Sequence, residues 1–214
     1  MMSRRITLLS LLGGILGAFM GFAPISATKA DTQHGMRSAE FIQSLARRAI
    51  DSLTNPEISR SVRIERFRVM FNDNFAVRSM GKRALGRYWR KTTTDERMEY
   101  QKLFERLMVI TYVDRFANYV GEDLNVLDNR IEDKAIVTVF SELRREGDAK
   151  SIRVDWIVGT NGTIYKVVDV KVEGISMTKM LASDFSSIIR QCDGQISGLI
   201  AELEKKTAQL FAKP

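Results

Sequence analysis

One stretch of the chain, VVDVKVEGISM at residues 167–177, contains residue types that could do chemistry. Glu173, Gly174 and Ser176 resemble part of a G-x-S-x-G nucleophile elbow, in which a serine on a sharp turn attacks an acyl carbon. Such a serine needs a base to take its proton, and the usual base is histidine. The only histidine is His34, in a stretch without an apolar pattern, and a threonine replaces the second glycine of the elbow. We therefore predict that Ser176 is not a nucleophile.

The same stretch is better interpreted as the end of a strand and the start of a helix. Gly174 is then the bend at which the strand releases the chain. Ile175 and Met177 are expected to turn toward the apolar interior. Ser176 or Thr178 is expected to cap the helix that follows.

Other chemical sites lack the residues that they need. The acidic pairs at 122–123 and 132–133 have no histidine beside them and lack the spacing of a calcium loop. Cys192 is the only cysteine, which excludes an internal disulfide and a cysteine-based metal cluster. Gly81 and Gly86 lack the Lys-Ser/Thr ending of a phosphate loop. We expect neither a metal nor a cofactor.

A pair of carboxylates remains as a candidate for acid–base work. Asp155 and Asp169 lie on neighbouring predicted strands, and a small α+β cone can host proton transfer if an acid points into an apolar cavity. Alternation along the strand places Asp155 opposite Trp156, so the acid is expected outside if the tryptophan is inside. An isomerase-like enzyme stays open as an alternative.

The N-terminus has the layout of a secretory signal peptide. Two arginines precede an uncharged apolar run, Ile6–Phe22, and small residues follow up to a predicted cleavage after Ala30. The alternative is an uncleaved anchor, which the four glycines in the run disfavour. We expect residues 1–30 to be removed and residues 31–214 to form a single domain outside the cytoplasm, with its formal charge lowered from +7 to +4.

Charge is spread unevenly along the chain. Residues 37–97 hold 14 Lys and Arg against 7 Asp and Glu, whereas residues 98–214 hold 16 against 18. Export makes nucleic acid an unsuitable partner. The basic half is expected to face anionic lipid or an acidic protein, unless it is only a solvated helical face.

The fold class follows from two periods in the apolar pattern. A helical period predicts one helix at 36–53, two or three short ones within 61–91, one from Thr93 to about Gly121, and two more after Met177. The helix that starts at Thr93 is expected to begin with a capping box between Thr93 and Glu96. An alternating period predicts strands at 123–132, 134–143, 150–159 and 162–172, the last two joined at Asn161–Gly162. We expect an α+β fold with N-terminal helices, a four-stranded antiparallel meander and C-terminal helices, enclosing an apolar cavity. The inward face of the third strand should carry Ile152, Val154, Trp156 and Val158.

Large, soft apolar side chains are unusually frequent. They are Met70, Phe71, Phe75, Met80, Phe104, Leu107, Met108, Tyr112 and Trp156. Such residues can line an expandable cavity for an acyl chain, or they can simply form the core.

Several motifs resemble one family in the right order. LGRYWRKTTTDERMEYQKLFERLMVITYVDRFANYVGE at 85–122, VDWIV at 154–158, NGTIYKVVDVKVEGISM at 161–177 and DFSSIIRQCDGQISGLIAEL at 184–203 resemble segments of the MlaC family, also known as toluene-tolerance Ttg2-type periplasmic proteins. The resemblance covers about residues 40–206.

This resemblance implies a function in lipid transport. Its members are expected to carry phospholipid through the periplasm, between an outer-membrane lipoprotein complex and an inner-membrane ABC transporter with an MCE-domain subunit, in support of outer-membrane asymmetry. A branch associated with hopanoid synthesis stays open, as does a pure interaction adaptor.

The stripe and alternation patterns nominate residues for this function. The expected lipid-binding residues are Met80, Leu85, Trp89, Phe104, Leu107, Met108, Tyr112, Val154, Trp156, Val167 and Ile175. The expected docking or head-group residues are Arg83, Arg87, Arg90 and Lys91. No residue is expected to be catalytic.

Overall fold

The computed structural model describes residues 29–118, 121–144 and 150–212. The predicted signal peptide lies outside the described residues up to residue 28. The helices are α1 (Lys29–Leu53), α2 (Arg60–Asn74), α3 (Val77–Leu85), the 3-10 helix η1 (Gly86–Lys91), α4 (Thr94–Ala117), α5 (Met177–Gln191) and α6 (Ile196–Phe211). The strands are β1 (Asp123–Asp133), β2 (Ile136–Arg144), β3 (Ile152–Thr160), β4 (Tyr165–Val172) and β5 (Ile175–Ser176).

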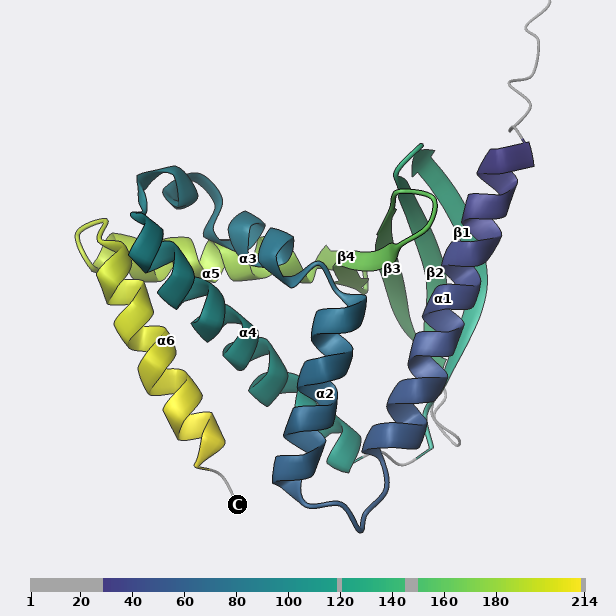
Figure 1. Ribbon diagram of the computed structural model, residues 1–214, viewed down its shortest axis with the longest axis horizontal. Helices are drawn as coiled ribbons and strands as arrows, with labels where there is room; N and C mark the ends of the chain where they lie inside the picture. The colour runs from purple at the N-terminus through teal and green to yellow at the C-terminus, as the bar shows by residue number, and fades with distance from the viewer. Residues whose placement is uncertain (1–28, 119–120, 145–149, 213–214) are drawn as a thin grey trace, which may run out of the picture.

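The strands form one antiparallel sheet in the order β1-β2-β3-β4-β5. The predicted antiparallel meander is confirmed. The predicted number of four strands was wrong, because β5 adds a fifth. Figure 1 shows the sheet with α1 on one side of the molecule, α3 to α6 on the other, and α2 between them. The two sides are separate layers of packing, and each has its own apolar cluster.

The sheet cluster lies between α1 and the sheet. Along β2 and β3 alternate side chains point toward α1. We name this side of the sheet the inner face. Ile42 and Leu45 of α1 are buried there; the sheet contributes Val137, Val139, Val158 and Val167. Since α1 packs mainly along β1 and β2, the inner face of β3 and β4 is left to other partners.

The helical cluster fills the other side. It is built around α4, which packs on α6, while α3 packs on α5. The predicted capping box is present: the Thr93 hydroxyl accepts from the Glu96 amide at 3.2 Å, and the Glu96 carboxylate accepts from the Thr93 amide at 2.8 Å. Two orphan amides are thereby satisfied where α4 begins.

The basic segment before α4 divides into short helices, as predicted. The chain leaves helical geometry after Asn74 and again at Gly86, whose φ is 56°. Gly81, in contrast, lies inside α3. A Cβ there would come within 3.1 Å of the Phe104 ring, so this glycine permits close approach of α3 and α4.

A few contacts join the two sides at the end of α2. Phe75 packs against both clusters and forms a parallel bridge with Val167 of β4, and the Ala76 amide donates to the Val167 carbonyl at 2.9 Å. Arg48 of α1 donates to Asn74 at 2.9 Å. Phe75 is therefore one point at which helices and sheet join.

Candidate functional site

The stretch from β4 into α5 forms a tight hairpin followed by a helix cap. Glu173 and Gly174 have φ values of 50° and 80°, and positive φ at both central residues is the mark of a type I′ turn. The Glu173 carboxylate accepts from the Arg153 amide at 2.6 Å, which ties this turn to β3. The bend predicted at Gly174 is confirmed as a two-residue hairpin loop.

Ser176 is a capping residue, and its hydroxyl points at a carboxylate. It accepts from the Lys179 amide at 3.1 Å and donates to Asp169 at 2.5 Å. Asp169 also accepts from the Thr178 hydroxyl at 2.8 Å, from the Thr178 amide at 3.1 Å and from the Val170 amide at 2.9 Å. This set of bonds, the Asp169 clamp, fixes the start of α5 to β4.

The chain's only histidine does not lie beside Ser176, whose hydroxyl donates to the Asp169 carboxylate. His34 lies on α1, and its Nδ1 is 3.4 Å from the Tyr165 hydroxyl at the start of β4. Strand β4 thus separates the environment of His34 from that of Ser176. The prediction that Ser176 is not a nucleophile agrees with this geometry.

Asp155 differs from its prediction in burial. It lies on the outer face, opposite Trp156, as alternation predicts, yet it is only 4% exposed. Arg153 covers it, with Nε 2.9 Å from Oδ1 and Nη2 3.0 Å from Oδ2, and this ion pair raises the pKa of Arg153. The Arg153 guanidinium also lies 5.4 Å from the Phe140 ring centroid. A carboxylate bound in this way, on the outer face, is not a free base in an apolar cavity.

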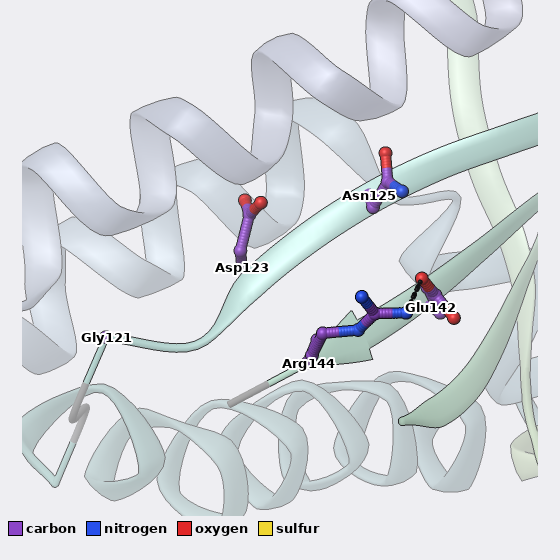
Figure 2. Close-up of a pocket in the computed structure, with 5 residues that line it drawn as sticks. All are labelled: Gly121, Asp123, Asn125, Glu142 and Arg144. Atoms are coloured by element: carbon purple, nitrogen blue, oxygen red, sulfur yellow. Dashed lines mark hydrogen bonds and ion pairs between the residues drawn. The ribbon is translucent and has the colours of Figure 1, made fainter. Parts of the chain in front are cut away.

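Two hollows of the structure lie on the sheet. Figure 2 shows one of about 340 Å³, lined by Asp123 and Asn125 of β1 and by Glu142 and Arg144 of β2. Glu142 and Arg144 form an ion pair, with 2.8 Å between nitrogen and oxygen. Another of about 490 Å³ adjoins Phe140 and Arg153. Neither includes a predicted lipid-binding residue. The predicted enclosed apolar cavity is not seen among the described residues.

The described residues hold neither a metal-ligating cluster nor a helix that could span a bilayer. No cluster of three or more metal-ligating side chains occurs in residues 29–118, 121–144 and 150–212. Over the same residues, no helix is both long and apolar enough to span a bilayer.

The predicted lipid-binding residues fall into two groups. Seven belong to the helical cluster or its edge: Met80, Leu85, Trp89, Phe104, Leu107, Met108 and Tyr112. Val154 is buried on the inner face, and Trp156 and Val167 belong to the sheet cluster. Ile175 was expected to turn toward the apolar interior; its side chain lies on the inner face, but it is 60% exposed. The structure therefore does not bring all of these residues together, and their part in lipid binding stays a prediction.

Helices and sheet meet at a smaller apolar set, which we name the seam. It consists of Met70 and Phe75 at the end of α2 and of Trp156, Val167 and Val170 on the inner face of β3 and β4. The Trp156 ring is held by a bond from its Nε1 to the Ser141 hydroxyl at 3.1 Å. Phe75 was noted in the sequence as soft apolar bulk, but it was not nominated for the site.

A row of rings leads from the seam along α2. Phe75 lies 4.8 Å from Phe71, Phe71 lies 6.1 Å from Phe67, and Phe67 lies 5.5 Å from Phe116 of α4, measured between ring centroids. Sequence reasoning missed this row. The signal was available, since phenylalanines four residues apart on one helix share a face.

The inner face continues past the seam with little cover. Val172 pairs with Ile175, so both side chains point to the face that carries Val154 and Trp156. Ile152, two residues before Val154, is 46% exposed. The face thus runs from buried to exposed apolar residues.

Comparison with known proteins assigns this arrangement to a family. A sequence model described as MlaC protein matches residues 43–205, most of the chain. The chain belongs to the MlaC family. The resemblance predicted from the motifs is confirmed.

The MlaC fold is also found in a solved structure. The chain is similar to the phospholipid-binding protein from Ralstonia solanacearum, whose structure was determined in complex with a phospholipid. The TM-score is 0.70, the sequences are 20% identical, and the match covers 81% of this chain and 98% of that one. At this identity the likeness establishes the fold.

In this MlaC family member the predicted docking cations lie away from the seam. Arg83 is on α3 and the other three are on η1, all exposed. Helix α3 begins next to the seam and has nine residues, which makes it about 13 Å long at 1.5 Å per residue. Arg87, Arg90 and Lys91 lie beyond its far end. A head-group role at the seam does not fit this placement, and a docking role stays a prediction.

Proposed function

We propose that the chain binds phospholipid acyl chains at the seam and carries the lipid. The observation that carries this proposal is the uncovered end of the inner face, where Ile152 and Ile175 are 46% and 60% exposed and continue the face past Val154. An acyl chain laid on this face would cover these side chains and extend toward Phe75. Membership of the MlaC family and the phospholipid-binding fold neighbour support the same function.

The physical need for a carrier is large. Exposing acyl chains costs roughly 0.8 kcal/mol per CH₂, so a lipid with two chains crosses water very slowly without a protein. An apolar surface between the row of rings and the inner face removes most of that cost. The head group can stay in solvent, and the transfer needs no bond to form or break and therefore no catalytic residue.

The wider setting belongs to the same proposal. We propose that the protein acts in the periplasm and exchanges lipid with an outer-membrane lipoprotein complex and with an inner-membrane ABC transporter that has an MCE-domain subunit. The apolar N-terminal run and the family membership support this setting.

The first test identifies bound lipid. The protein is purified from cells that express the full 214-residue chain, and native mass spectrometry followed by lipid extraction measures what it retains. We expect one phospholipid per protein. A hopanoid would redirect the proposal to that lipid class, and an empty protein would refute the carrier function.

A matched pair of variants locates the site. Phe75→Ala removes a ring from the seam, and Phe140→Ala removes an equally half-buried ring from the outer face. Because a phenylalanine side chain contributes about 1.5–3 kcal/mol when covered, Phe75→Ala should release lipid at least about tenfold faster. Phe140→Ala should match the unsubstituted protein. Equal effects would place the lipid elsewhere.

A further inference from the structure

Cations and two aromatic rings gather at the corner formed by α3, η1 and the end of α5. We name this the cationic corner; its members are Lys82, Arg83, Arg87, Arg90, Lys91 and Arg190, with the rings of Tyr88 and Trp89. All six cationic side chains are exposed, whereas Tyr88 is buried and Trp89 is half-buried. The corner includes the four predicted docking cations.

The charges of the corner are not neutralised by neighbours. In the described part of the chain, none of the six cations forms an ion pair with a carboxylate. Three of them lie over rings: Arg87 is 5.1 Å and Lys91 6.0 Å from the Tyr88 centroid, and Lys82 is 6.0 Å from that of Trp89. Unpaired like charges held this close favour an anionic partner.

Arg97 holds the corner in shape without adding to its free charges. It lies on α4, 5.3 Å from the Trp89 centroid, and its guanidinium donates to the Trp89 carbonyl at 3.1 Å and to the Thr92 hydroxyl at 2.9 Å. These bonds fasten η1 to α4. The other cations are thus displayed on a rigid base.

The ionisation of Tyr88 reports the local field. The hydrogen bond from Arg87 at 3.3 Å, with the positive charges of Arg87, Arg190 and Lys91, lowers the pKa of Tyr88 despite its burial. A negative group is therefore stabilised at this place.

We propose that the cationic corner binds the surface of an anionic bilayer. Its charged ends are long, exposed and not fixed by partners, which suits phosphates that stand in no fixed pattern. Tryptophan and tyrosine beneath cations are typical of the interface between a bilayer and water. Met98, next to Arg97, is 55% exposed and adds an apolar contact at the same corner.

An acidic protein is the other partner that such charge could attract. A specific protein interface usually fixes its arginines by ion pairs and several hydrogen bonds. At this corner Arg87 donates one hydrogen bond, to the Tyr88 hydroxyl, and only Arg97 donates several. The bilayer therefore fits better. The three cations of η1, Arg87, Arg90 and Lys91, are separated from the seam by the length of α3, so this proposal stands apart from lipid binding at the seam.

The test measures sedimentation of the full chain with vesicles. Vesicles of phosphatidylglycerol in phosphatidylcholine are compared with pure phosphatidylcholine, at low and at high salt. We expect binding only to the anionic vesicles, and weaker binding at high salt, where screening shortens the reach of each charge. Each cation near the surface contributes about a fivefold gain in partitioning.

Two triple variants separate the corner from net charge. R87Q/R90Q/K91Q removes three corner cations, and R37Q/K205Q/K206Q removes three exposed cations from α1 and α6. The corner variant should lose about a hundredfold in partitioning, and the control only a few-fold. Lipid retained after purification should be unchanged in both, which keeps this result separate from carriage at the seam.

Three results would overturn the proposal. These are absence of binding to anionic vesicles at low salt, equal binding to neutral vesicles, and equal losses in the two triple variants. The first would leave the corner to an acidic protein. The third would show that net charge, not the corner, drives binding.

Discussion

The Asp169 clamp is open to a graded test of stability. Asp169→Ala removes the acceptor for the Ser176 and Thr178 hydroxyls and the Thr178 amide at the start of α5, and for the Val170 amide of β4. Hydrogen bonds to a charged group are worth about 1.5–3 kcal/mol each, but water and the Ser176 cap replace part of them. We expect a loss of about 3 kcal/mol in the free energy of unfolding.

Asp169→Asn is expected to cost less. Its amide keeps an oxygen for Thr178 and presents an NH₂ group to the Ser176 hydroxyl, which can accept a bond in place of donating one. The loss should be about 1 kcal/mol. Asp184→Asn, an exposed acid on the same helix, is the control and should stay within about 0.5 kcal/mol of the unsubstituted protein.

Urea unfolding followed by circular dichroism measures these differences, and thermal melting checks them. For a domain of this size 1 kcal/mol shifts the midpoint by roughly 2–4 °C, so Asp169→Ala should melt about 6–12 °C lower. In a double-mutant cycle, Asp169→Ala and Ser176→Ala should couple by about 1–2 kcal/mol, because they share a bond. Additive losses, or a loss no larger than that of Asp184→Asn, would refute the clamp.

Two other predictions concern single sites. Gly198→Ala should destabilise α6 by about 1–3 kcal/mol, because the added Cβ meets the Sγ and Cβ atoms of Cys192. The loss is expected even though alanine favours helices more than glycine does. Urea unfolding measures it, with Ser197→Ala as the control. In an alkaline absorbance titration Tyr88 should ionise before an ordinary tyrosine, and Tyr100 after it, because burial raises its pKa. Since the folded-state pKa of Tyr88 is lowered, its contribution to stability is present above the unfolded-state pKa and is lost as the pH falls through the folded-state pKa. Tyr88→Phe should remove the early phase, and an unchanged titration curve would contradict the cationic field.

The order and type of the main elements could be predicted because the apolar period is strong. Helix α4 has a capping box at its start, and each of β1 to β4 begins within three residues of its predicted position. Strand β5 was missed for a specific reason. Its hairpin loop is Glu173–Gly174, whereas the usual signal for such a loop is Asn-Gly or Asp-Gly.

The burial of a strand side chain was harder to predict than the face of the sheet to which it points. Alternation correctly placed Asp155 opposite Trp156, but it carries no information on how long side chains fold over a face. Arg153 and Phe140 cover Asp155, so an acid on the outer face is buried. In the same way Ile175 has the direction expected of an inner-face residue but no helix above it.

The location of the site depends on which elements meet, and a helical stripe does not specify its partner. Phe104 and Leu107 lie on the apolar stripe of α4, and that helix packs on α6 rather than on the sheet. The sheet instead meets α2 at Phe75. Residues from a stripe and residues from a strand can therefore both be buried without lining one pocket.

The uncovered part of the inner face gives the proposed function its energetic basis. A fully covered isoleucine gains about 1.5–3 kcal/mol relative to an exposed one, and the fold forgoes part of this gain at Ile152 and Ile175. A protein evolved only for stability would extend a helix over these residues. An acyl chain that covers them recovers the same free energy, and it does so only while bound. Exposed apolar residues that continue a buried face are therefore a better sign of a lipid site in this fold than the buried stripe of α4.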